Sequence, residues 1–152
     1  MHKNAFRLNS KTSKNSYDWW WHSFVAKHAE TGELRPFFIE YYVVNPGLWN
    51  GQMQLGQSEH NKANNIKPCY AMIKAGAWGE NKVQINNFWG ISDFKASRQE
   101  LNCTIAHNTL TETHLSGKVS VTESEHTKTE KTLHAIQSEV QSTNKIALSV
   151  DC

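Results

Sequence analysis

Residues 17–24 read Tyr-Asp-Trp-Trp-Trp-His-Ser-Phe, and residues 37–46 read Phe-Phe-Ile-Glu-Tyr-Tyr-Val-Val-Asn-Pro. Successive side chains of a β-strand point to opposite faces, so both runs place large aromatic rings on both faces of a strand. One face can join a core, whereas the other needs a second core, a partner or a ligand. This excess of aromatic surface indicates a binding cavity more strongly than it indicates any one reaction.

The two runs are predicted to pair as a β-hairpin formed by residues 17–28 and 35–45. Residues 29–34 between them contain a glycine suited to a turn position with positive φ. A turn centred on residues 31 and 32 would pair Trp20 with Val43. Both faces of this hairpin are apolar over most of their length. We therefore expect an all-β, lipocalin-like antiparallel barrel or sandwich, incomplete in this chain, with material packed against each side.

The rest of the chain also alternates in a way that is typical of β-structure. A long connection over residues 46–67 precedes a second predicted hairpin, residues 68–78 and 82–89, with its turn at residues 79–81. Further strands are predicted over residues 99–107, 109–115, 117–123 and 145–150, with a turn at Ser116-Gly117. Residues 124–144 fit either a helix or a strand. Residues 1–16 form a polar leader that is predicted to be loose or to add a short edge segment, and residues 17–152 form one β-rich domain.

Composition excludes several classes of protein. Of the 152 residues, 38% are hydrophobic and 20% are charged, and the net charge is +2. Lys and Arg are scattered along the chain and form no basic stripe, so no nucleic-acid partner is expected. The three cysteines, Cys69, Cys103 and Cys152, form no Cys-x-x-Cys pair and, without a secretory signal, indicate reduced thiols and a cytoplasmic location. No run approaches the ~20 apolar residues that a membrane span requires, so no stable membrane insertion is expected. The spacing of Cys103, His107 and His114 matches no structural zinc pattern, so no metal is expected.

The Trp-rich strand, the Thr31-Gly32-Glu33 turn and the stretch Phe37-Phe38-Ile39-Glu40-Tyr41 resemble the bacterial tocopherol cyclase-like proteins. These proteins are related in fold to hydroxyneurosporene synthases and other lipocalin-like proteins. Residues 67–76 are similar to the same group, and the resemblance covers about residues 17–122. It implies two lipocalin-like domains in a full-length member, of which this chain would be the N-terminal half. It also implies an isomerase-type ring closure, by protonation of a prenyl double bond, without metal, nucleotide or other cofactor. We expect a chain lacking the second half to be inactive if the active cavity needs both halves.

An acid-catalysed cyclase needs a proton donor and an aromatic pocket that stabilises a cation. The candidate catalytic residues are Glu40, Asp18 and His22, since a carboxyl group among aromatic rings is kept protonated by desolvation. The candidate ligand-binding residues are aromatic: Trp19, Trp20, Trp21, Tyr41, Tyr42 and Trp49. Each also has a structural interpretation. Glu40 would be an exposed or salt-bridged strand residue, Asp18 a strand-entry or turn residue, His22 a structural histidine with its hydrogen bonds satisfied, and the tryptophans plain core.

Three functions remain open from the sequence. The first is binding of an apolar prenyl or quinol-type small molecule in a β-barrel cavity, with or without cyclase chemistry. The second is a non-catalytic carbohydrate-binding module that stacks sugars on a row of tryptophans. The third is a structural half-domain that pairs with a second lipocalin-like domain or with another copy in a homodimer. A closed pocket favours the first, an open row of tryptophans the second, and a flat patch without polar residues the third.

Overall fold

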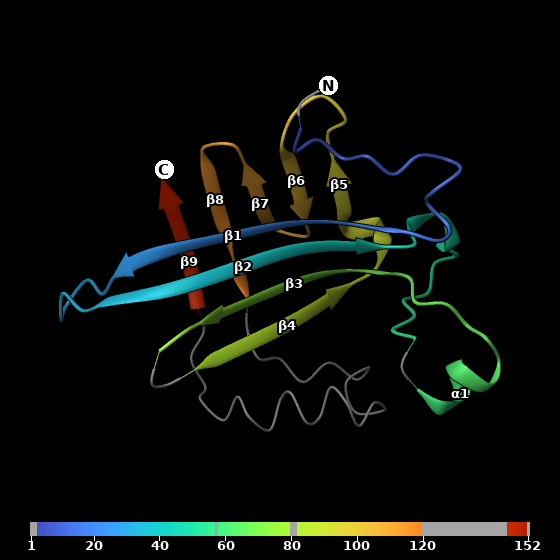
Figure 1. Ribbon diagram of the computed structural model, residues 1–152, viewed down its shortest axis with the longest axis horizontal. Coiled ribbons are helices and arrows are strands. Elements are labelled where there is room, and N and C mark those ends of the chain that lie inside the picture. Colours follow the sequence, from blue (N-terminus) through green and yellow to red (C-terminus); the bar gives the residue numbers. More distant parts are fainter. Residues whose placement is uncertain (1–2, 57, 80–81, 120–145, 152) are drawn as a thin grey trace.

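The chain folds as two antiparallel β-sheets packed face to face (Figure 1). The computed structural model describes residues 3–56, 58–79, 82–119 and 146–151. The first sheet has the order β1-β2-β3-β4 and the second the order β5-β6-β7-β8-β9. The predicted all-β class is confirmed in its sandwich form, because the strands within the described ranges do not close into a barrel.

The strands of the first sheet are β1 (Tyr17–Lys27), β2 (Leu34–Val44), β3 (Tyr70–Ala77) and β4 (Val83–Trp89). Those of the second are β5 (Phe94–Ala96), β6 (Asn102–Ile105), β7 (Asn108–Thr111), β8 (His114–Val119) and β9 (Ile146–Asp151). Short helical turns lie between them: η1 (Pro46–Leu48), α1 (Glu59–Ala63) and η2 (Ile91–Asp93). Both predicted hairpins and the strand near residues 145–150 are therefore present.

The predicted register of the first hairpin is wrong by two residues. Trp20 pairs with Tyr41 rather than with Val43. The loop has the expected length but is centred one residue earlier, over residues 28–33. There the His28 amide donates to the carbonyl of Glu33 at 2.8 Å, and the Gly32 amide donates to the carbonyl of His28 at 3.0 Å. A shift of two residues keeps every side chain on its predicted face, since the side-chain period of a strand is two.

The turn predicted at Ser116-Gly117 is also wrong, because both residues lie inside β8. A Cβ atom at Gly117 would stand 2.1 Å from Oδ1 of Asn108. That amide is buried; its oxygen accepts from the Lys118 amide at 2.6 Å and its nitrogen donates to the carbonyl of Ile105 at 3.2 Å. Glycine is thus required by close packing and not by a turn. The three-residue strand β5 was not predicted, and residues 124–144 lie outside the described residues.

The core fills the space between the two sheets. The first sheet contributes the even-numbered residues of β1 and the odd-numbered residues of β2 and β3, including Trp20, Tyr41 and Ile73. The second sheet contributes Ile105 and Leu110 among others. Burial of apolar surface stabilises such a core by about 25 cal/mol per Å².

The N-terminal leader is bound to this core through residues 4–8, so this part of the leader is not loose. Ala5 and Leu8 are buried, and the Phe6 ring lies 5.4 Å from the ring of Phe94 and 6.4 Å from that of Trp20. The Phe6 amide donates to the carbonyl of Ser97 at 2.9 Å, and the Arg98 guanidinium donates to the carbonyl of Leu8 at 2.6 Å.

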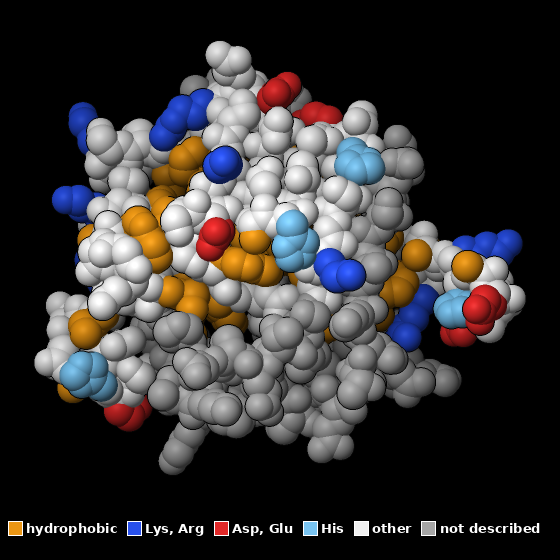
Figure 2. Space-filling model, turned by 180° about the vertical axis from the view of Figure 1, so that it is seen from behind, with side chains coloured by type: hydrophobic (Ala, Val, Ile, Leu, Met, Phe, Trp, Pro, Cys, Tyr) orange, Lys and Arg blue, Asp and Glu red, His pale blue; other side chains and the backbone are white. Residues whose placement is uncertain are grey.

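The outward side of the molecule at the second sheet carries mostly polar side chains and backbone, with hydrophobic side chains showing between them (Figure 2). Within the part of the chain that the structure describes, no helix has the length and apolar character to cross a membrane.

Candidate ligand-binding surface

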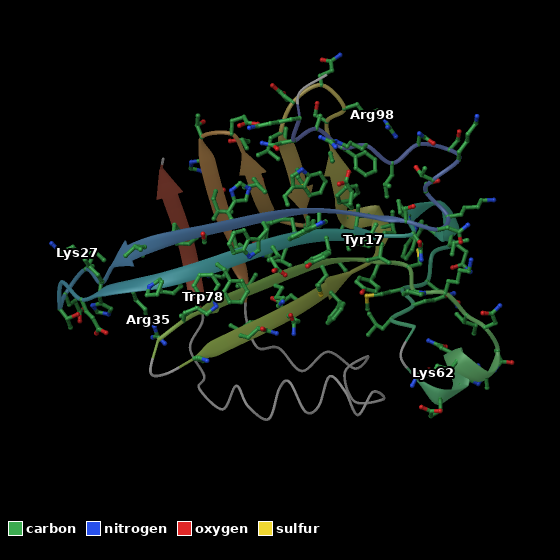
Figure 3. The ribbon with its side chains drawn as sticks, viewed as in Figure 1. Tyr17, Lys27, Arg35, Lys62, Trp78 and Arg98 are labelled. Carbon is green, nitrogen blue, oxygen red and sulfur yellow. The ribbon has the colours of Figure 1, made fainter. Side chains whose placement is uncertain are left out.

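Aromatic side chains cover the outer side of the first sheet, away from the core. They come from the odd-numbered residues of β1, the even-numbered residues of β2, β3 and β4, and the position just after β3. We call this surface the aromatic face; its rings are Tyr17, Trp19, Trp21, Phe38, Tyr42, Tyr70, Trp78 and Phe88. Figure 3 shows Tyr17 and Trp78 toward opposite ends of the sheet.

The rings of the aromatic face pack against one another in pairs. Trp19 stacks on Tyr42 with ring centroids 5.8 Å apart and 12° between planes, and Phe38 stacks on Trp78 at 5.2 Å and 23°. Trp21 lies 6.3 Å from Trp78. Such pairs contribute about 0.5–1.5 kcal/mol each beyond area burial. They fix the rings in place but leave Trp19 46%, Trp21 45% and Trp78 39% exposed. The result is a preorganised, open aromatic surface.

A polar group of three residues interrupts this face. Lys74 Nζ lies 3.3 Å from Oε2 of Glu40 and 5.7 Å from the centre of the Phe38 ring. The Tyr42 hydroxyl donates to Glu40, and burial followed by this hydrogen bond and the charge of Glu40 raises the pKa of Tyr42 to about 12. We call Glu40, Tyr42 and Lys74 the polar triad.

Glu40 and Lys74 are close enough to form an ion pair, but the angles between them do not meet the requirements of a hydrogen bond. Oε2 of Glu40 is buried and has no hydrogen-bond partner among the described residues, although Lys74 Nζ is near enough to neutralise its charge. The ion pair and the missing hydrogen bond are compatible, because Coulomb attraction depends on distance whereas a hydrogen bond also depends on direction. A largely buried ion pair is seldom stabilising relative to apolar residues. Stability alone therefore does not explain the presence of this ion pair in an aromatic surface.

The structure brings together only four of the candidate residues, namely Trp19, Trp21, Glu40 and Tyr42. Trp20, His22 and Tyr41 point to the other side of the same hairpin, toward the core. The Trp20 indole donates to the carbonyl of Asn4 at 2.7 Å, which gives this tryptophan a structural partner. The consecutive tryptophans thus divide between the two faces of the hairpin.

Two titratable groups lie on the core side of the hairpin, the half-buried His22 and the fully buried Tyr41. Burial lowers the pKa of His22, and the negative charge of Glu112 opposes that shift. Tyr41 is fully buried, which raises the pKa of its hydroxyl, and that hydroxyl has no hydrogen-bond partner within the described part of the chain. A small space beside Tyr41 and Asn108 has room for about one water molecule.

Asp18 and Trp49 belong to other parts of the structure. Asp18 accepts hydrogen bonds from the Arg7 amide at 2.8 Å and from the Trp19 amide at 3.1 Å, so it ties the leader to β1. The Trp49 ring covers Gly90, where a Cβ atom would stand 2.5 Å from Cη2 of the indole. Both side chains therefore have packing or hydrogen-bonding roles.

Lys74, Phe38, Tyr70, Trp78 and Phe88 were not among the candidates. A signal for some of them exists in the sequence, since Tyr70, Met72 and Lys74 alternate along a predicted strand. The pairing of Glu40 with Lys74 across β2 and β3 depends on a long-range register that alternation does not provide.

No group of three or more His, Cys, Asp or Glu side chains that could hold a metal ion occurs among the described residues. Comparison with known proteins found no match: no family model, no curated protein and no solved structure is similar to this chain.

Proposed function

We propose that this protein binds an apolar, ring-containing small molecule of the prenyl or quinol type on the aromatic face. The observation that carries the proposal is the pair of half-exposed tryptophans beside the polar triad: Trp19, which stacks on Tyr42, and Trp21, which packs at a tilt against Trp78. The proposed site lies on the outer side of the first sheet, because the space that described residues line beside Tyr41 admits only about one water molecule.

The chemistry of the face supports an apolar ligand with one polar end. The rings and the neighbouring Met72 and Val44 offer apolar area, and their mutual stacking lowers the entropy that binding would cost. Lys74 can donate to a ligand oxygen, and the Glu40 carboxylate can accept from a hydroxyl once Lys74 shifts on its flexible chain. A few polar groups among apolar side chains are typical of sites that bind and orient small molecules.

The resemblance to tocopherol cyclase-like proteins implies the same ligand chemistry and supports the proposal. The proposal is limited to binding. An ion-paired carboxylate is an acceptor and not a proton source, so ring closure by Glu40 would require that its pair with Lys74 first be broken.

Carbohydrate binding is the second candidate, and one observation favours it. The exposed tryptophans Trp19, Trp21 and Trp78 form an open row rather than a closed pocket. Against it stands the apolar character of the surrounding residues, since Val44, Phe38 and Met72 offer a sugar hydroxyl no hydrogen bond.

The test is a tryptophan fluorescence titration of the purified protein with geranylhydroquinone and, separately, with a soluble cello-oligosaccharide. We expect saturable quenching by the quinol alone, weakened at least about tenfold in Trp21→Ala if one stacked ring contributes about 1.5 kcal/mol. Leu34→Ala, an exposed apolar residue at the hairpin loop end of β2, is the matched control and should bind as the wild type does.

Quenching by the oligosaccharide alone would replace the proposal with the carbohydrate module. Failure of both ligands to quench a folded sample would leave the aromatic face as a surface for protein contact.

A further inference from the structure

A second site is suggested by an open cleft at the end of the first sheet where β1 and β3 begin. Its lining residues come from three separate segments: Lys14, Asn15, Leu48, Gln54, Asn65, Ile66 and Lys67. The lining includes Leu48 at the end of η1 and residues that follow α1. Figure 1 shows α1 beside this end of the first sheet. None of its side chains belongs to the aromatic face or to the polar triad.

Backbone hydrogen bonds hold the walls of this cleft in place. The Gly47 amide donates to the carbonyl of Ser13 at 2.8 Å, and the Asn45 amide donates to the carbonyl of Ser16 at 2.9 Å. Gly47 also leaves no room for a Cβ atom, which would stand 2.4 Å from Oγ of Ser13. The leader segment that carries Lys14 and Asn15 is thus packed directly on η1.

The opposite wall is fixed in a similar way. Gln54 and Cys69 exchange backbone hydrogen bonds of 3.0 and 2.7 Å. The buried side chain of Asn45 donates to the carbonyl of Pro68 at 2.8 Å, which ties the end of β2 to the residue after Lys67. The cleft is therefore preorganised, and a ligand would not have to order its walls.

The lining is rich in cationic and amide donors and contains no carboxylate. Lys67 Nζ donates to Oδ1 of Asn15, which directs this ammonium toward the leader wall. Within the described part of the chain, neither Lys14 nor Lys67 has a salt-bridge partner. Both lysines line the same cleft, so an anion bound there would be attracted by two positive charges. The amides of Asn15, Gln54 and Asn65 add neutral donors, and Leu48 and Ile66 add apolar contact.

We propose that this cleft binds an oxyanion, a phosphate or carboxylate group attached to a small apolar body. Lys14 and Lys67 would hold the charged group by charge-assisted hydrogen bonds, and Leu48 and Ile66 would contact the apolar part. The site is independent of the ligand proposed for the aromatic face, so either one can fail without the other.

The experiment is an assigned ¹H–¹⁵N NMR titration of the full chain with phenyl phosphate, with benzyl alcohol as the uncharged analogue. We expect saturable shifts of the cleft amides with phenyl phosphate only, weakening as ionic strength rises. The double variant Lys14→Gln/Lys67→Gln should weaken binding at least about tenfold, because each lost contact is a hydrogen bond to a charged group.

A control variant separates the cleft from the general positive charge of the protein. Lys11→Gln/Lys95→Gln removes the same charge from two exposed lysines, one on the same leader and one on β5, and should bind phenyl phosphate within about twofold of the wild type. Equal loss in both double variants, equal shifts with benzyl alcohol, or the absence of saturable shifts would each overturn the proposal. All four lysines are exposed, so neither double variant is expected to unfold, and circular dichroism checks this.

Discussion

The two faces of the β1–β2 hairpin carry similar side chains but have different environments. On the inner face, Trp20 and Tyr41 are paired across the strands and buried against the second sheet. On the outer face, Trp19 and Tyr42 are paired in the same way and stacked at 5.8 Å, yet Trp19 remains 46% exposed. Composition is thus no guide to role here. The inner rings are buried in the core, whereas the outer rings remain partly exposed to solvent.

Removing one tryptophan from each face tests whether the inner and outer rings differ in their contribution to stability. Trp20→Ala should lower the free energy of unfolding by about 3–5 kcal/mol, because it leaves a cavity in the core and removes the hydrogen bond to the carbonyl of Asn4. Trp21→Ala, next in the sequence, should cost less, about 1–2 kcal/mol, because this ring is 45% exposed and loses only its contact with Trp78 and part of its burial. Urea unfolding of both variants measures the difference, and equal losses would contradict the assignment of the two faces.

The second prediction concerns the polar triad on the outer face. Lys74→Met should destabilise the protein by about 3 kcal/mol, since it leaves the Glu40 carboxylate buried without its counter-charge. The double variant Glu40→Leu/Lys74→Met should return to within about 1 kcal/mol of the wild type, because no unpaired charge remains. Chemical unfolding checks both. A double variant as unstable as the single one would show that the pair itself is needed for folding.

The third prediction concerns the core side of the second sheet, where Gly117 packs against the buried Asn108. Gly117→Ala should cost about 1–3 kcal/mol, because the added methyl group would displace the buried Asn108 amide from its two backbone partners. Thermal unfolding compared with Ser116→Ala in the same strand provides the measurement and its control. A neutral Gly117→Ala would mean that Asn108 can move at little cost.

The smallest expected effect is the pH dependence due to His22. Burial lowers the pKa of this imidazole from its ordinary value of 6.5 in the folded protein. In the window just below pH 6.5 the unfolded chain therefore binds more protons than the folded one. Stability should accordingly rise with pH through that window and fall as the pH is lowered.

His22→Gln should flatten this dependence in urea unfolding measured across the window, whereas His60→Gln, an exposed histidine on α1, should leave it unchanged. If the free energy of unfolding of His22→Gln depended on pH as strongly as that of the wild type, another group would cause the pH dependence.

Alternation along the chain was enough to predict the strands of both hairpins and the division of the tryptophans between two faces, because the side-chain period of a strand is fixed. It was not enough to predict the register, which depends on hydrogen bonds around His28 and Glu33 in the loop. Nor could it place Lys74 beside Glu40, since that contact depends on how β2 and β3 align. The packing of Phe6 on Trp20 could not be predicted either, because a single aromatic residue in a polar leader has no periodicity.

The central claim is that a ligand uses the outer and not the inner rings of the hairpin, and the six tryptophans provide a direct test of it. Each indole N–H gives its own signal in a ¹H–¹⁵N spectrum, so a titration with geranylhydroquinone can be followed ring by ring. We predict saturable shifts for Trp19, Trp21 and Trp78, with the signal of the core residue Trp20 unchanged. Shifts confined to Trp20, or no saturable shift at the three outer tryptophans, would contradict the account.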